Sequence, residues 1–121
     1  MTASTNNPPM YIGEVAKKTG LTIKAIRFYE AKQLIPPVKR SGRYRIYSQS
    51  DIEILLLIKE AKSLGIRLSE LSKVIQYKEG QLNWQKVNLF LQDVKKQIKQ
   101  DIQELEQRII VIDQCMAQIN Q

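Results

Sequence analysis

Apolar residues in the first part of the chain recur at the three- and four-residue spacing of short helices. Ile12, Val15 and Ala16 share one face of a segment that ends at Gly20, a residue suited to the left-handed conformation that follows a helix. Thr22 then offers an N-cap oxygen for a second helix. The residues expected to face inward from this second helix are Ile23, Ala25, Ile26, Phe28 and Leu34. Two short helices across a glycine-containing turn predict a helix-turn-helix.

The pattern changes at Pro36 and Pro37, which block any helical continuation. Residues 38–47 interleave basic side chains with strand-favouring Val, Ile and Tyr, and contain a turn at Ser41 and Gly42. This stretch therefore predicts a small β-hairpin, or wing, directly after the second helix.

Two more helices are predicted after the hairpin. Ser48 and Asp51 are similar to a capping box, and the helix that they open is expected to run to the residue before Gly65. Its apolar residues are dense, which predicts the core helix. They are Ile52, Leu55, Leu56, Ile58 and Ala61. Residues 68–77 predict a fourth helix, and Gly80 is expected to begin a linker.

The last part of the chain carries a seam of apolar residues at alternating three- and four-residue steps, with one extra four-residue step, or stutter. The seam consists of Trp84, Val87, Leu91, Val94, Ile98, Ile102, Leu105, Ile109, Ile112, Met116 and Ile119. No Gly or Pro interrupts residues 84–119, so one helix of about 54 Å is expected. A stripe this long is too large for the preceding domain to cover, which favours a homodimer over a helix folded back on its own domain. The expected dimerisation residues are Val94, Ile98, Ile102, Leu105, Ile109, Ile112 and Met116.

These patterns predict a mainly α-helical protein in three parts. Residues 1–9 are small and polar and are expected to be a disordered tail. Residues 10–80 are expected to form the winged helix-turn-helix domain, and residues 81–121 the coiled-coil helix.

The charge of the chain is unevenly distributed. The formal net charge is +7, and residues 1–80 hold 14 Lys and Arg against 7 Asp and Glu, whereas residues 81–121 hold 5 of each. Residues 17–45 contain nine basic residues and one acid, Glu30, a density typical of a surface that faces phosphates. A basic face that serves only solubility is the alternative, but it does not require the interleaved tyrosines at positions 29, 44 and 47.

The composition excludes most other classes of protein. The chain has no histidine and a single cysteine, Cys115, so a disulfide framework, a Cys/His zinc site and a His-based acid/base pair are excluded. We expect no enzyme activity, no metal and no cofactor. The longest apolar run, residues 54–58, is too short to span a bilayer, and residues 1–10 lack the features of a signal peptide. A cytoplasmic protein is expected.

A helix-turn-helix with a basic wing docks on DNA with its second helix in the major groove and its wing against the adjacent backbone or minor groove. Thr22, Lys24 and Arg27 lie in the first half of that helix, where side chains reach base edges. Arg27 suits either a guanine edge or a phosphate. Phe28 is expected to face the core, and Tyr29 to direct its hydroxyl to a phosphate, with a packing ring as the alternative for Tyr29.

Three stretches carry a resemblance to a known family. IGEVAKKTGLTIKAIRFYEAKQLIPP, RSGRYRIYSQSDI and IKEAKSLGIRLSEL, in this order between about residues 11 and 75, resemble the MerR family of bacterial transcription regulators. The long helix resembles the antiparallel dimerisation helix of that family. The resemblance implies a homodimer on an inverted-repeat operator within an over-long promoter spacer. There the regulator bends and untwists the DNA so that RNA polymerase can read both promoter elements.

The resemblance also implies which residues contact DNA. They are Thr22, Lys24, Arg27 and Tyr29 in the recognition helix, Arg43, Tyr44, Arg45 and Tyr47 in and after the wing, and Lys62 beside the wing. Many members have glycine where Arg43 stands, so the wing is expected to have a slightly different shape here. Metal-sensing members place cysteines at the start of the dimerisation helix, where this chain has residues 78–81 without cysteine. Cys115 is expected to be an ordinary helix residue, with a sensor thiol as the alternative.

Two other classes of function remain open. The first is an excisionase-like architectural protein that bends DNA during recombination, although such proteins rarely carry a long heptad helix. The second is a coiled-coil adaptor that does not bind DNA, which the concentration of positive charge in residues 1–80 disfavours.

Overall fold

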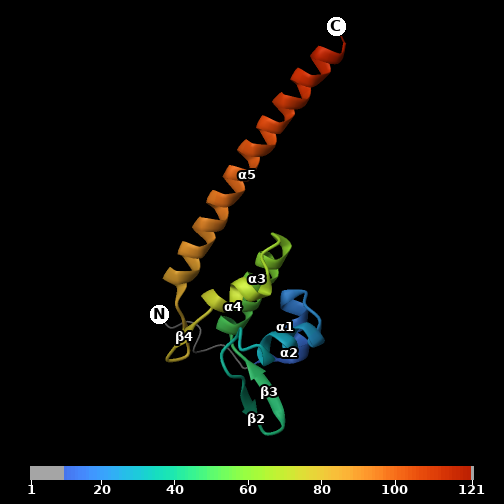
Figure 1. Cartoon of the computed structure of the whole chain (residues 1–121). Coiled ribbons are helices and arrows are strands. Elements are labelled where there is room, and N and C mark those ends of the chain that lie inside the picture. The colour runs from blue at the N-terminus through green and yellow to red at the C-terminus, as the bar shows by residue number, and fades with distance from the viewer. Residues whose placement is uncertain (1–9, 121) are drawn as a thin grey trace. The chain divides into compact units, whose positions relative to one another are not determined.

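The computed structural model describes residues 10–120, and the expected tail over residues 1–9 lies outside them. The chain divides into two compact units, one that ends at Asn83 and one that begins at Trp84 (Figure 1). We call residues 10–83 the head. The long terminal helix is the second unit.

Helix α1, Ile12–Thr19, begins the helix-turn-helix and ends where the sequence predicts. Gly20 adopts a left-handed conformation with φ 76°, and its N–H donates to the carbonyl of Ala16 at 2.9 Å. The Thr19 side chain is buried, and its hydroxyl donates to the carbonyl of Val15 at 2.8 Å. The Thr19 hydroxyl and the Gly20 N–H thus both find hydrogen-bond acceptors within α1, as buried polar groups require.

Helix α2, Ile23–Ala31, follows with the predicted N-cap, because the Thr22 side chain accepts a hydrogen bond from the backbone N–H of Ala25 at 3.0 Å. Its orientation differs from the predicted one. Phe28 is 47% exposed, whereas Tyr29 is only 7% exposed.

The reason for this difference is the helical period. Ile26 is fully buried, and the residue three positions later, Tyr29, lies on the same face, whereas Phe28 is about 200° around the helix from Ile26. Ile23 is also 41% exposed rather than buried. The prediction that Phe28 faces the core is therefore wrong, and for Tyr29 the alternative of a packing ring holds in place of an outward hydroxyl.

The wing is a three-stranded antiparallel sheet with the order β1-β3-β2. Strand β2 is Lys39–Ser41 and strand β3 is Tyr44–Tyr47, with Gly42 in a left-handed conformation at the turn. These two strands are the predicted hairpin. The third strand, β1, Met10–Tyr11, was not predicted, because two residues carry no readable alternation.

Helix α3, Gln49–Ser63, is the core helix, and Ser48 and Asp51 form the predicted capping box. One of its expected core residues differs. Leu56 is 38% exposed, whereas Ile54 is 1% exposed and takes the inward position.

Helix α4, Leu68–Val74, is shorter than predicted, and the expected linker at Gly80 is a second hairpin. It pairs β4, Tyr77–Lys78, with β5, Gln81–Leu82, across two residues with positive φ, Glu79 and Gly80. Such a two-residue turn matches the twist of a hairpin.

The hydrophobic core of the head joins all of its helices. Its most deeply buried apolar side chains are Val15 of α1, Ile26 of α2, Ile54, Leu55 and Ile58 of α3, and Leu34 of the loop after α2, and α4 adds Leu71. Each contributes about 1.5 to 3 kcal/mol of burial free energy. This core fixes α2 relative to α1 and α3, and so positions the exposed face of the helix-turn-helix.

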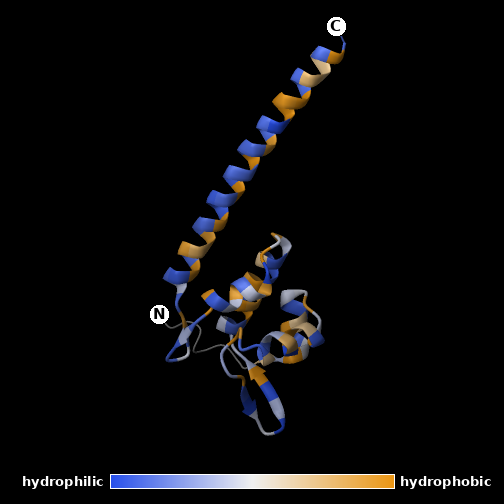
Figure 2. Cartoon of the chain, in the orientation of Figure 1, coloured by the Kyte–Doolittle hydropathy of each residue, from blue (hydrophilic) through white to orange (hydrophobic). Residues whose placement is uncertain are grey.

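Helix α5, Trp84–Ile119, has the bounds predicted from the absence of Gly and Pro. Figure 2 shows apolar residues recurring turn after turn along it between hydrophilic ones. Every residue from Lys95 to Asn120 is exposed in the single chain, including large side chains such as Leu105 at 53% and Ile109 at 58%. Across residues 10–120, no helix is long and apolar enough to cross a membrane.

Candidate nucleic-acid interface

The first half of α2 presents polar and basic side chains to solvent. Thr22, Lys24 and Arg27 are exposed. The Thr22 oxygen is occupied as the N-cap acceptor, which leaves its hydroxyl hydrogen and methyl group for an outside partner. Among residues 10–120, neither Lys24 nor Arg27 forms an ion pair with an acid, whereas Lys18 pairs with Glu14 and Arg45 with Glu30.

Of the predicted contact residues in the wing, Arg43 and Tyr44 are exposed. The ring of Tyr44 is 60% exposed and meets the ring of Tyr11 edge to face, with 5.7 Å between the centroids. Tyr11 lies on β1, and it was missed by sequence reasoning because its position beside the wing depends on pairing of β1 with β3. This contact between the two rings holds β1 against the start of β3.

A small hollow of about 120 Å³ lies between α2 and the wing. We call it the arginine hollow; its lining residues are Tyr11, Ile12, Arg27, Arg43, Tyr44 and Arg45. Three arginines therefore border one site: Arg27 from α2, Arg43 from the turn of the wing and Arg45 from β3. Such a concentration of like charge attracts an anion and supplies N–H donors in the geometry that phosphate oxygens accept.

The arginine hollow changes the interpretation of Arg27. The sequence left a base edge and a phosphate equally open for this side chain. Because Arg27 lines the same hollow as Arg43 and Arg45 of the wing, its surroundings favour a backbone phosphate.

One carboxylate, that of Glu30, joins α2 to strand β3 of the wing. Glu30 accepts a hydrogen bond from Arg45 Nε at its Oε2 and another from the Tyr47 hydroxyl at its Oε1, both at 3.0 Å. Burial, and next the hydrogen bond to Glu30, raise the pKa of Tyr47 well above its usual range. Tyr47 is therefore a neutral donor at physiological pH.

Two of the predicted contact residues are not surface residues of the single chain. Tyr47 is 2% exposed and Tyr29 is 7% exposed, so both rings belong to the core of the head rather than to its outer face. Lys62 is exposed in the last turn of α3, where a cation suits the helix dipole, and it does not line the arginine hollow.

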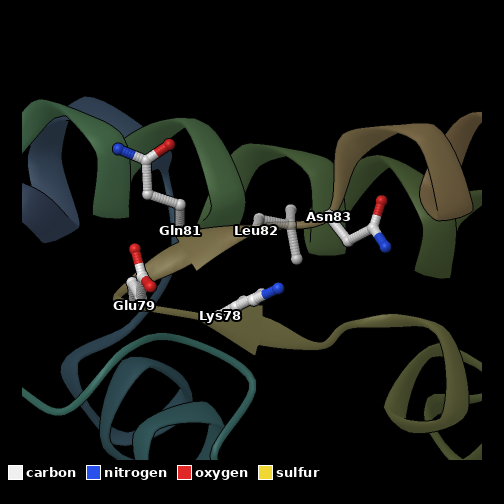
Figure 3. Close-up of a pocket in the computed structure, with 5 residues that line it drawn as sticks. All are labelled: Lys78, Glu79, Gln81, Leu82 and Asn83. Carbon is white, nitrogen blue, oxygen red and sulfur yellow. The ribbon is translucent and has the colours of Figure 1, made fainter.

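A second hollow, of about 320 Å³, surrounds the β4–β5 hairpin. Figure 3 shows its lining residues, Lys78, Glu79, Gln81, Leu82 and Asn83, with Glu79 at the tip of the hairpin. These side chains include one carboxylate and no thiol. The described part of the chain contains no group of three or more His, Cys, Asp or Glu that is suited to hold a metal ion, and Cys115 is exposed on α5.

The fold and this basic surface define a winged helix-turn-helix protein of the DNA-binding class. Residues 10–78 match the family described as MerR HTH family regulatory protein. The chain is 37% identical over 117 residues to the HTH-type transcriptional regulator CueR of Salmonella typhi, an alignment that covers 91% of this chain and 76% of CueR. The chain belongs to the MerR family, as the sequence motifs predicted, and it is a DNA-binding transcription regulator rather than an enzyme.

Solved structures agree on the fold. MtaN, the N-terminus of the Bacillus subtilis multidrug transporter activator, is 25% identical with a TM-score of 0.62, over 88% of this chain and 97% of MtaN. HiNmlR, a MerR family regulator lacking the sensor domain and bound to promoter DNA, has a TM-score of 0.59 at 23% identity, over 84% of this chain and 79% of HiNmlR.

Proposed function

We propose that this regulator acts as a homodimer on an inverted-repeat operator within a promoter, where it bends and untwists the DNA so that RNA polymerase can read both promoter elements. A dimer has two equal heads, and an inverted repeat offers two equal half-sites related by the same two-fold symmetry. The observation that carries the proposal is the exposed apolar seam of α5 in a chain whose head belongs to a DNA-binding family.

The seam supports dimerisation through its length and exposure. Ile102, Leu105 and Ile112 are each at least half exposed in the single chain, and they repeat at coiled-coil spacing. The other residues proposed for the interface are Val94, Ile98, Ile109 and Met116. Exposed apolar stripes of this extent are unusual on monomers and mark interaction sites. An antiparallel pair is proposed.

Within each half-site, we assign α2 to the major groove. Thr22 and Lys24 are the proposed contacts to base edges, because they are exposed on the first turns of the helix. Arg27, Arg43 and Arg45 are the proposed contacts to backbone phosphate, because they line the arginine hollow.

The remaining predicted residues receive different roles. Tyr44 is proposed to contact the backbone with its exposed hydroxyl, and Lys62 to contact a phosphate farther along. Tyr29 and Tyr47 are proposed to support the helix and the wing from within the head, since their rings are buried.

Bending is proposed because phosphate contacts offset the elastic cost of DNA distortion. Bending an operator costs on the order of 1 to 6 kcal/mol of elastic free energy. Several charge-assisted hydrogen bonds from the two heads to phosphates can offset this cost. RNA polymerase is the proposed partner at the distorted promoter.

The test is selection of genomic fragments from the source organism by the purified protein at about 0.15 M salt, followed by sequencing of the retained DNA. Enrichment of a dyad inside a lengthened promoter spacer supports the proposal, and a gel-mobility assay with the site moved along a fragment then measures the bend. Enrichment of recombination attachment sites alone points instead to an excisionase-like role. The matched control is the chain with Lys24, Arg27 and Arg43 all replaced by alanine, which should retain no fragments.

A further inference from the structure

We infer that Glu30 is a positioning residue for DNA binding: its carboxylate holds the Arg45 guanidinium at the arginine hollow and so aligns the wing with the recognition helix. This inference rests on the proposed function, because it assigns a role within the same DNA-binding surface.

The location of Glu30 is electrostatically unfavourable for a protein that binds phosphates. It is the one acid among nine basic residues in the stretch 17–45, and it is the second-to-last residue of α2. A negative charge near DNA repels phosphate, and a carboxylate at a helix C-terminus opposes the helix dipole. A specific interaction is therefore needed to explain a carboxylate at this position.

The geometry supplies that interaction. The two carboxylate oxygens of Glu30 accept from two side chains of β3, Arg45 and Tyr47, which are two residues apart and so lie on the same face of the strand. One side chain of α2 therefore fixes two positions of the wing. Both bonds are 3.0 Å long, within the range of well-formed hydrogen bonds.

The surroundings of Glu30 strengthen this contact. Its side chain is 19% exposed, and that of Arg45 is 33% exposed. Glu30 also borders a hollow of about 660 Å³ beside Pro37, Val38 and Ile75, and no other charged side chain lines that hollow. A charge pair in partly apolar surroundings is stronger than one in open solvent.

The contact leaves Arg45 able to bind an anion. Only its Nε donates to Glu30, so the terminal N–H groups of the guanidinium stay available. Arg45 also lines the arginine hollow together with Arg27 and Arg43. Arg45 therefore contacts Glu30 through Nε and also borders the hollow, which Glu30 itself does not line.

The proposal makes a prediction opposite to that of simple electrostatics. If Glu30 were only a repulsive charge, Glu30→Gln would tighten DNA binding and leave the salt dependence unchanged or steeper. If Glu30 positions Arg45, Glu30→Gln weakens operator affinity by about tenfold, the size of one charge-assisted hydrogen bond. The slope of log K against log salt should also become shallower by about one unit, because one phosphate contact is lost.

The matched control is Glu14→Gln, which removes an equal charge from an exposed side chain on α1 that pairs with Lys18. It should leave the affinity unchanged or slightly higher. In an Arg45→Ala background, Glu30→Gln should cause no further loss of affinity, because Glu30 acts through Arg45. Tyr47→Phe keeps the bond between Glu30 and Arg45 and should cost less than Glu30→Gln.

If Glu30→Gln lowers the melting temperature too far for a binding assay, a variant of its partner Arg45 provides the test instead. Arg45→Lys retains the charge but loses the Nε donor and the planar fork. It should weaken binding nearly as much as Arg45→Ala. Full affinity in Arg45→Lys, or unchanged affinity and slope in Glu30→Gln, would overturn the inference.

Binding by the unsubstituted protein distinguishes a failure of the proposed function from a failure of the role assigned to Glu30. Failure of the parent chain to bind any selected operator contradicts the proposed function itself. Binding by the parent, together with full binding by Glu30→Gln, contradicts only the positioning role of Glu30.

Discussion

The ammonium group of Lys59 in α3 donates a hydrogen bond to the backbone carbonyl of Thr19 at the end of α1, over a distance of 2.9 Å. This contact spans 40 residues of sequence and covers the left-handed Gly20 that turns the chain toward the recognition helix. A cation at a helix C-terminus also suits the helix dipole. The turn of the helix-turn-helix is therefore fixed from a different helix.

Gly20→Ala should destabilise the head. The φ of 76° strains any residue with a side chain, and a Cβ there would lie 2.6 Å from Lys59 Nζ, so the end of the Lys59 side chain must also shift. We expect a loss of about 1 to 2 kcal/mol in the free energy of unfolding, measured by urea denaturation followed by circular dichroism. The control, Gly13→Ala, adds a Cβ that meets nothing within 4 Å and should be neutral or slightly stabilising. Equal stability of the two variants would contradict the proposed strain.

Leu105→Asp should convert the proposed homodimer to a monomer. It places a charge in the middle of the apolar seam of α5, where a partner helix would have to bury it. Light scattering after size-exclusion chromatography measures the mass directly. Gln107→Asp adds the same charge on the opposite side of the helix and should leave the dimer intact. A dimeric Leu105→Asp chain would exclude the seam as the interface.

Arg27→Ala should weaken binding to all sequences alike and make the salt slope shallower by about one unit, as expected for a phosphate contact. Lys24→Ala, by contrast, should relax the preference for bases at one position of each half-site. Titration of labelled operators with single-base changes, at several salt concentrations, separates the two effects. A change of base preference in Arg27→Ala at constant slope would return this side chain to a base edge.

Asp51→Asn should change how stability depends on pH. Burial, opposed by the hydrogen bonds from Ser48, raises the pKa of Asp51 above its usual range. The folded state therefore holds this proton more tightly than the unfolded state. The resulting stabilisation is complete below the unfolded pKa of about 3.9 and is lost as the pH rises through the folded pKa.

The measurement is urea unfolding of the parent and the Asp51→Asn variant at pH values from about 3.5 to 7, a range that brackets ordinary carboxyl pKa values. The stability of the parent relative to the variant should fall as the pH rises. Asparagine still accepts the Ser48 N–H bond, so the cap remains comparable. The control, Glu53→Gln, changes an exposed carboxylate of the same helix, and its free energy of unfolding should change with pH as that of the parent does. A constant difference between parent and Asp51→Asn would show that burial does not perturb this carboxyl group.

Local signals predicted the helices of the head well. Gly20, Thr22 and the Ser48–Asp51 box each act on backbone groups within a few residues, so their effect is readable without the fold. The long helix was equally readable, because its seam repeats over 36 residues.

The candidate site was predicted less completely, because it depends on contacts distant in sequence. Tyr11 joins the arginine hollow only through the pairing of β1 with β3. Glu30 was visible as a lone acid in a basic stretch, but its partners lie 15 and 17 residues away. The exchange of Phe28 and Tyr29 did not depend on distant contacts, because the helical spacing from Ile26 already places Tyr29 on the buried face and Phe28 away from it.

Met10 of β1 pairs with Tyr47 of β3, so the strand before the helix-turn-helix is hydrogen-bonded to the last strand of the wing. The orientation of the wing is thus set when the head folds, and little conformational entropy remains to be lost when it meets DNA. Such preorganisation favours a head that docks as one rigid piece. Distortion on binding should then fall mainly on the more compliant partner, the double helix.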